Sequence, residues 1–168
     1  MCIRDRYKAP GTVAGFNAAT STPVASATTA TTELYKNADG SYTRKAWSGP
    51  VNYQTASGSW APIDDTLAQG AGGRWQEKAN SVSASFAAAA SDSSLAAATS
   101  ADGSQQVSFA LAGAGNVAGS VSGSSVTYPG ALPGTDVTET ATPDGMSESL
   151  TLSSAAAGTS WVFPLTLK

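Results

Sequence analysis

Apolar and polar residues alternate along much of this chain, in short runs separated by turn residues. In the run SVSASFA, residues 81–87, Val82, Ala84 and Phe86 fall on one parity and the serines fall on the other. A period of two is typical of a strand that buries one face. No segment shows the 3.6-residue apolar period of an amphipathic helix of ordinary length, so the pattern predicts an all-β protein.

Turn signals divide these runs into hairpins. An Asn-Ala-Asp-Gly turn separates expected strands at residues 32–36 and 41–47, and Pro143-Asp144-Gly145 separates two more. A second hairpin is expected between Val51 and Ile63, around an Ala-Ser-Gly turn. Such closely spaced turns favour an antiparallel β-sandwich built from short hairpins.

The alanine-rich segment AAAASDSSLAAAT is open to two interpretations. Its alanines suit a helix, but Ser-Asp-Ser-Ser interrupts it and an Asp102-Gly103 turn follows. We therefore favour a loop followed by a strand, which leads into a further strand with Val107, Phe109 and Leu111 on one face.

The chain is expected to comprise an N-terminal segment, residues 1–30, and one β-sandwich module, residues 31–168. The opening MCIRDR matches the translation of a transposon adapter used in sequencing libraries, so residues 1–6 are interpreted as adapter read-through in a metagenomic fragment. Residues 9–30 are rich in Ala, Thr, Ser and Pro, which predicts a disordered linker. The final run WVFPLTLK alternates up to the last residue, so the module is expected to be truncated there.

Composition narrows the possible chemistry. The net charge is −3 and the sequence pI is about 4.7, which argues against a nucleic-acid partner because binding phosphates needs a basic surface. No run of about 18 apolar residues is present, so no membrane span is expected. There is no histidine, and the single cysteine lies in the adapter-like opening, which excludes His- and Cys-based catalysis and zinc sites within this fragment. No cofactor is predicted.

The acidic residues offer two hypotheses, both weaker than a structural role. Asp64 and Asp65 are adjacent, and neighbouring residues on a strand point to opposite faces, which does not suit the paired carboxylates of a glycoside hydrolase. Asp136, Glu139 and Asp144 could supply oxygens to calcium, but no closely spaced run of acids completes such a site.

Aromatic residues suggest a binding surface. Tyr42, Trp47, Tyr53, Trp60 and Trp75 lie close together in the sequence. They either fill a core otherwise built from alanine and valine, which we favour, or form an exposed platform on which sugar rings stack. The glycan-stacking candidates are Trp47, Trp60 and Trp75.

The stretch SVTYPGALPGTDVTET combines two Pro-Gly steps with an acidic residue. Proline presets φ and glycine tolerates positive φ, so we interpret the stretch as a structural corner between two strands. Its residues are Tyr128, Pro129, Gly130, Pro133, Gly134 and Asp136. Asp136 is expected to accept backbone hydrogen bonds at the start of the second strand.

Three segments together resemble one protein group. They are YKNADGSYTRKAWSGPVNYQTASGSWAPIDDTL, VTYPGALPGTDV, and the pair DGMSESLTL with WVFPL. These are similar to the N-terminal β-rich regions of actinobacterial Rhs/YD-repeat and DNRLRE-domain proteins, some of which are polymorphic toxins. One departure is Ser147, where the family pattern often has lysine. The resemblance implies secretion, a cell-surface or wall location, and a module without catalytic residues ahead of a much longer parent chain.

The sequence thus predicts a non-enzymatic structural or interaction module of a secreted, wall-associated Rhs-like protein. Its expected partners are the rest of the parent chain and cell-wall polysaccharide. A carbohydrate-binding module that uses exposed aromatics is the alternative, and a glycoside hydrolase fragment is a poorer one.

Overall fold

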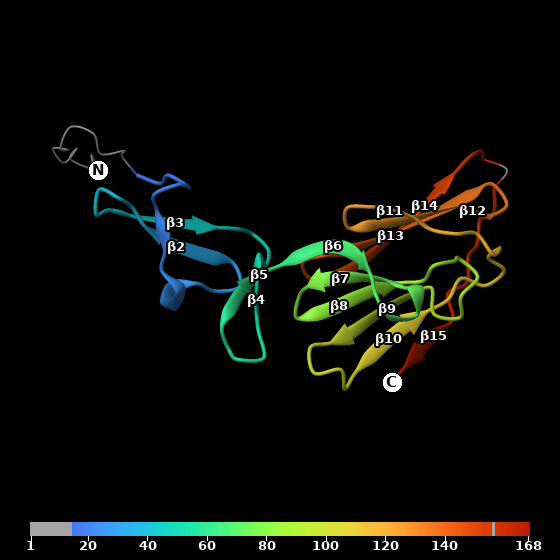
Figure 1. The fold of residues 1–168 in the computed structure, drawn as a ribbon. Coiled ribbons are helices and arrows are strands. Elements are labelled where there is room, and N and C mark those ends of the chain that lie inside the picture. Colours follow the sequence, from blue (N-terminus) through green and yellow to red (C-terminus); the bar gives the residue numbers. More distant parts are fainter. Residues whose placement is uncertain (1–14, 156) are drawn as a thin grey trace.

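The computed structural model describes residues 15–155 and 157–168 and confirms an all-β fold with antiparallel sheets (Figure 1). The adapter-like residues 1–6 and the first part of the predicted linker lie outside the described residues. Within the described ranges, no helix has the length and apolar character needed to cross a membrane.

Fifteen strands and two short 3₁₀ helices make up the described chain. The N-terminal elements are β1 (Thr22–Pro23), η1 (Ala25–Ala27), β2 (Thr32–Lys36), β3 (Tyr42–Ala46), β4 (Asn52–Gln54) and β5 (Trp60–Pro62). The next are β6 (Asp64–Gln69), η2 (Ala71–Gly73), β7 (Trp75–Ala79), β8 (Val82–Phe86), β9 (Ala96–Ser100) and β10 (Gln106–Phe109). The last are β11 (Ser120–Ser122), β12 (Ser125–Leu132), β13 (Thr135–Thr142), β14 (Gly145–Leu152) and β15 (Leu165–Leu167). The alanine-rich segment is a loop followed by strand β9, as predicted.

Two antiparallel sheets from β6 onward form the sandwich, residues 64–168. One sheet has six strands in the order β15-β10-β9-β8-β7-β6, and the other has four in the order β11-β12-β13-β14. The four-stranded sheet lies across the six-stranded one, with β13 and β14 contacting β6 and β8 (Figure 1). A backbone hydrogen bond from Leu67 N–H to the Gly123 carbonyl also joins β6 to the β11–β12 turn.

The core lies between these two sheets and is unusually rich in alanine. Phe86, Leu95, Tyr128 and Val137 are fully buried there. More than half of the buried apolar residues in the described chain are alanines: Ala84, Ala87, Ala90, Ala96, Ala97, Ala131 and Ala141. Small side chains let the two backbones approach closely, so the aromatic rings of Phe86 and Tyr128 supply much of the buried apolar area.

The strands β1 to β5 lie outside the sandwich in a region that we call the arm, residues 15–62. It consists of a three-stranded sheet, β1-β2-β3, and the separate hairpin β4–β5 (Figure 1). None of the residues in the main hydrophobic cluster comes from the arm. The predicted module of residues 31–168 therefore comprises two regions, and the sandwich begins at Asp64.

The described part of the predicted linker, residues 15–30, differs from the expectation of an unpaired segment. Strand β1 pairs with β2, and the Phe16 ring packs edge-on against Tyr35 with ring centroids 4.8 Å apart. The Lys45 ammonium lies 3.6 Å from the Phe16 ring centroid. Low-complexity composition predicted disorder, but these few aromatic and backbone contacts dock the segment on the first hairpin.

The predicted structural corner is the turn and bulge of the β12–β13 hairpin. Pro133 and Gly134 form its turn, where Gly134 has φ +67°. The pairing register shifts between Tyr128 and Leu132, which accommodates Pro129 and Gly130 as a bulge. The stretch thus reverses the chain within one sheet. Because the bulge removes only a few residues from the ladder, regular pairing resumes on both sides of it.

The terminal run alternates as expected, but only Leu165–Leu167 forms a strand, β15, which pairs with β10. Trp161 and Phe163 pack against the core, whereas Leu165 and Leu167 are exposed. The alternation therefore does not predict burial along the whole run, because β15 is the outermost strand of the wider sheet.

Candidate functional site

A concave site lies where the β4–β5 hairpin meets the sandwich. It is a cleft of about 340 Å³. Tyr53, Gln54 and Trp60 line it from the arm, and Ser81, Pro143 and Asp144 line it from the sandwich. The lining is mainly apolar with a few polar groups, which is the usual character of a small-ligand site.

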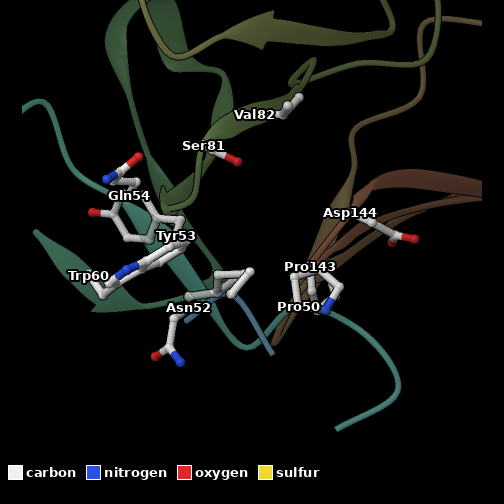
Figure 2. Close-up of a pocket in the computed structure, with 11 residues that line it drawn as sticks. Pro50, Asn52, Tyr53, Gln54, Trp60, Ser81, Val82, Pro143 and Asp144 are labelled. Atoms are coloured by element: carbon white, nitrogen blue, oxygen red, sulfur yellow. The ribbon is translucent and has the colours of Figure 1, made fainter. Parts of the chain in front are cut away.

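The two aromatic rings lie on one side of this cleft, and Pro143 and Asp144 lie across from them (Figure 2). Trp60 begins β5 and is 38% exposed, while Tyr53 in β4 is half-buried. The Asp144 carboxylate is turned away from both rings in this view. An exposed indole beside a phenol offers apolar faces that contribute binding energy when a planar or sugar ring covers them.

Hydrogen bonds fix the hairpin that carries the aromatic rings. The Asn52 side chain is buried and its amide donates to the Thr29 carbonyl at 3.0 Å. The backbone N–H groups of Val51 and Asn52 both donate to the Ala30 carbonyl. At the end of the same strand, β4, the Gln54 side-chain amide donates to the Gly58 carbonyl in the turn. The rings therefore project from a braced element.

The sandwich side of the cleft is held by a different set of polar contacts, all of them within the sandwich. The Asn80 side-chain amide donates to the carbonyls of Thr142 and Pro143 and to a carboxyl oxygen of Glu77. Glu77 is buried and also accepts the Ala84 N–H at 3.0 Å. These bonds place the β13–β14 turn against the six-stranded sheet, which shapes the sandwich side of the cleft.

The structure separates the three predicted glycan-stacking residues. Trp60 lines the cleft, and Trp47, directly after β3, is 40% exposed but is not among the residues that line the cleft. Trp75 lies in β7 opposite Phe86 and packs against the core. Sequence spacing placed the three tryptophans together because periodicity cannot show which face of an edge hairpin remains open.

The paired acids Asp64 and Asp65 lie at the start of β6, at the junction of the two regions. Asp64 accepts hydrogen bonds from the backbone and hydroxyl of Thr66, which lower its pKa. Lys78 lies 3.9 Å from the same carboxylate. Asp64 thus stabilises the local strand start. Neither Asp64 nor Asp65 lines the cleft.

The three acids considered for calcium do not converge. Asp136 accepts the Gly130 N–H at 2.7 Å across the β12–β13 bulge, as expected of an acid at the start of a strand. Glu139 lies on the opposite face of β13, because it is an odd number of residues away. Asp144 accepts the Thr142 hydroxyl in the next turn. Among residues 15–155 and 157–168, no group of three potential metal-ligating side chains gathers.

A carboxyl pair that the sequence did not single out lies inside the sandwich. Glu139 is fully buried and its direct cross-strand partner in β14 is Glu148. Apart from the Glu148 carboxyl, which can hydrogen-bond to Glu139 only if one of the two groups is protonated, neither carboxyl oxygen of Glu139 has a hydrogen-bond partner in the described chain. Burial, reinforced by the nearby negative charge of Glu148, raises the pKa of Glu139 to about 9.

A signal for this pair was present in the sequence. Glu139 shares its parity with Val137 and Ala141, and Glu148 shares its parity with Met146 and Leu150. The Pro143-Asp144-Gly145 turn then places the two glutamates opposite each other. Reading Glu139 together with its apolar neighbours, instead of with distant acids, would have predicted a buried carboxyl group.

Comparison of this chain with protein-family models, curated proteins and solved structures finds no match. The function is therefore inferred from the geometry of the cleft and of the carboxyl pair.

Proposed function

We propose that this chain is a non-catalytic interaction module of a large exported, surface-associated protein, of the Rhs/YD-repeat kind that its three motifs resemble. The observation that carries the proposal is the cleft between arm and sandwich, with an exposed Trp60 and a half-buried Tyr53 on a braced hairpin. Its lining combines aromatic rings, amides and prolines, which favours binding over group transfer.

The placement of the resembling segments supports this proposal. The first segment, residues 35–67, runs from the end of β2 through β5 into β6 and therefore contains the whole aromatic side of the cleft. The second is the bulged β12–β13 hairpin, and the third includes β14 and its preceding turn with Asp144. Two of the three segments thus contribute residues that line the cleft, although they lie about eighty residues apart in the chain.

Recovery of the complete gene tests the class of parent protein. We expect an export signal upstream of this module and YD repeats downstream of it. A complete gene that encodes a cytosolic enzyme with neither feature would overturn the proposal.

A carbohydrate-binding module is the second candidate function, with cell-wall polysaccharide as the expected ligand of the cleft. The specific observation is the exposed Trp60 indole, 38% accessible, next to the Tyr53 ring and the Gln54 side chain. Sugar rings stack on such faces through their C–H groups, and amides or hydroxyls at the rim accept or donate the hydrogen bonds that orient the ring.

Co-sedimentation of the purified chain with isolated actinobacterial wall polysaccharide tests this candidate. We expect Trp60→Ala to reduce binding by at least about tenfold, since losing one stacking contact costs on the order of 1–2 kcal/mol. Trp47→Ala is the matched control, because Trp47 is as exposed as Trp60 but lies outside the cleft lining. Equal losses in the two variants would point to a broad platform, and no loss in either would exclude glycan binding by stacking in the cleft.

A further inference from the structure

The β13–β14 hairpin carries a buried carboxyl group that is left without a hydrogen bond when it is ionised. Glu139 is completely inaccessible, and the only hydrogen-bond partner that its carboxyl group has within the described residues is the Glu148 carboxyl, which requires one of the two groups to carry a proton. An ionised carboxylate in this position would be strongly destabilising, because burial removes its hydration and nothing replaces it. Glu139 is compatible with this site when it carries a proton.

The directly opposed residue supplies the second half of the pair. Glu148 faces Glu139 across the ladder and is half-buried among the core-facing residues Met146 and Leu150. Side chains directly opposite each other on one face of an antiparallel pair lie close together. Two carboxylates this close together repel each other, so the state in which the pair shares one proton is favoured over the state with two negative charges.

The other groups around β13 do not compensate a charge on Glu139. From β12, the nearby titratable group is Tyr128, whose buried hydroxyl donates to the Ala87 carbonyl and whose pKa is raised by burial and by Glu139. Strand β8, packed across the interface, contains no titratable residue. Arg74, a cation that acts on Tyr128, donates to the carbonyls of Ser85 and Ser94 and lies 3.9 Å from Asp92.

The acids on the remaining packed strands form a separate group. Asp64 and Asp65 of β6 act on Glu77 of β7, whose pKa is raised chiefly by burial. In contrast to Glu139, Glu77 receives hydrogen bonds from Asn80 and Ala84. Lys78 is exposed and is directed to Asp64. The elements packed against β13 therefore surround Glu139 with apolar and acidic groups.

We propose that Glu139 and Glu148 form a proton-sharing carboxyl pair that makes the seating of the β13–β14 hairpin on the six-stranded sheet dependent on pH. With the proton in place the hairpin packs against the sheet. When the proton is released to solvent, the buried charge weakens this packing. This role of the pair is separate from the proposed binding function. It implies that the sandwich is stable at acidic pH and becomes less stable at alkaline pH.

The direction of the pH effect follows from linkage. The folded pKa of Glu139, about 9, lies above the ordinary glutamate value of 4.5. The folded state therefore holds the proton more tightly than the unfolded state does, and the contribution to stability is complete below about pH 4.5. It is lost as the pH rises toward 9, and between these limits one such proton lowers the folding equilibrium constant about tenfold per pH unit.

Denaturant unfolding of the complete chain at a series of pH values tests the pair. Glu139→Gln keeps the shape of the side chain but cannot ionise. The free energy of unfolding of this variant should therefore lack the part of the pH dependence that corresponds to the release of about one proton. The variant should also be more stable than the unmodified chain at pH 8. Glu148→Gln should weaken the dependence less, because burial alone continues to act on Glu139. Glu33→Gln, in β2 of the arm, is the matched control and should keep the full dependence.

The proposal would be overturned if the free energy of unfolding of Glu139→Gln changed with pH as steeply as that of the unmodified chain. If that variant fails to fold, carboxyl ¹³C NMR titration of the unmodified chain decides instead. A Glu139 signal that titrates well above the ordinary glutamate range supports the pair, and one that titrates in that range overturns it. Stabilisation by added calcium at alkaline pH would identify a cation site and would likewise overturn the pair.

Discussion

The arm and the sandwich are both made of short antiparallel strands, but different interactions hold them together. In the sandwich, Phe86, Leu95, Tyr128 and Val137 are fully buried between two sheets. In the arm, the buried side chains are the polar Asn37 and Asn52, and the contacts are hydrogen bonds and the stacking around Phe16. Large aromatics are therefore free to face solvent in the arm, where Tyr42, Trp47 and Trp60 are exposed.

This difference suggests a division of labour. A region that does not need its aromatic rings for a core can present them to a partner, provided that another region supplies stability. The cleft lies where the two regions meet and takes its rings from the arm and its opposite wall from the sandwich. This comparison requires that most of the stability of the chain resides in the sandwich.

The largest effect is expected from Phe86→Ala. Phe86 is completely buried in β8, so truncation should reduce the free energy of unfolding by about 3–5 kcal/mol through lost burial and an unfilled cavity. Denaturant unfolding followed by circular dichroism measures this loss. A loss below about 1 kcal/mol would mean that the sandwich core is not the main source of stability.

A smaller loss is expected from Gly119→Ala, which lies in the loop before β11. A Cβ built at this position would lie 2.5 Å from Val126 Cγ1 and 2.8 Å from Tyr128 Cε1. Because both neighbours are fully buried, relief requires a backbone shift, and we expect destabilisation by about 1–3 kcal/mol. Gly115→Ala is the matched control, since its nearest contact would be an ordinary 3.6 Å. Similar thermal midpoints for the two variants would contradict the close packing.

The smallest effect on unfolding is expected in the arm, from Phe16→Ala. This change removes the ring contacts to Tyr35 and to the Lys45 ammonium, which are worth about 0.5–1.5 kcal/mol in all. Limited proteolysis should cut residues 15–30 faster, while the unfolding midpoint of the sandwich stays unchanged. A matching fall in that midpoint would show that the two regions unfold together.

Local sequence patterns predicted most strands but not their grouping. The turns at Asp39-Gly40 and Asp144-Gly145 and the alternation of residues 81–87 predicted β2–β3, β13–β14 and β8, because turn chemistry and period are properties of a few neighbouring residues. Which hairpins share a core depends on contacts far apart in the chain. The boundary at Asp64 therefore could not be placed, and residues 31–63 were assigned to the sandwich.

The candidate site was predictable only in part, for a related reason. The aromatic cluster was recognised from residue type, but a core role was favoured for it, whereas Trp60 is exposed and lines the cleft. Ser81, Pro143 and Asp144 join the cleft only after the β13–β14 turn docks on the six-stranded sheet. Glu139 was considered only as a calcium ligand together with Asp136 and Asp144, because glutamate seldom lies in a core and its apolar neighbours were not taken into account. Its partner Glu148 becomes visible once the hairpin register is known.

The alanine-rich core also constrains how this sequence can change over generations. At seven buried positions the side chain is already a single methyl group, so random substitution there almost always adds volume. Damage at these positions comes from crowding, and crowding spreads to neighbours because interiors are close-packed. Sequence drift in such a family should therefore exchange alanine, glycine and serine at these sites, while the few large residues around them remain the same.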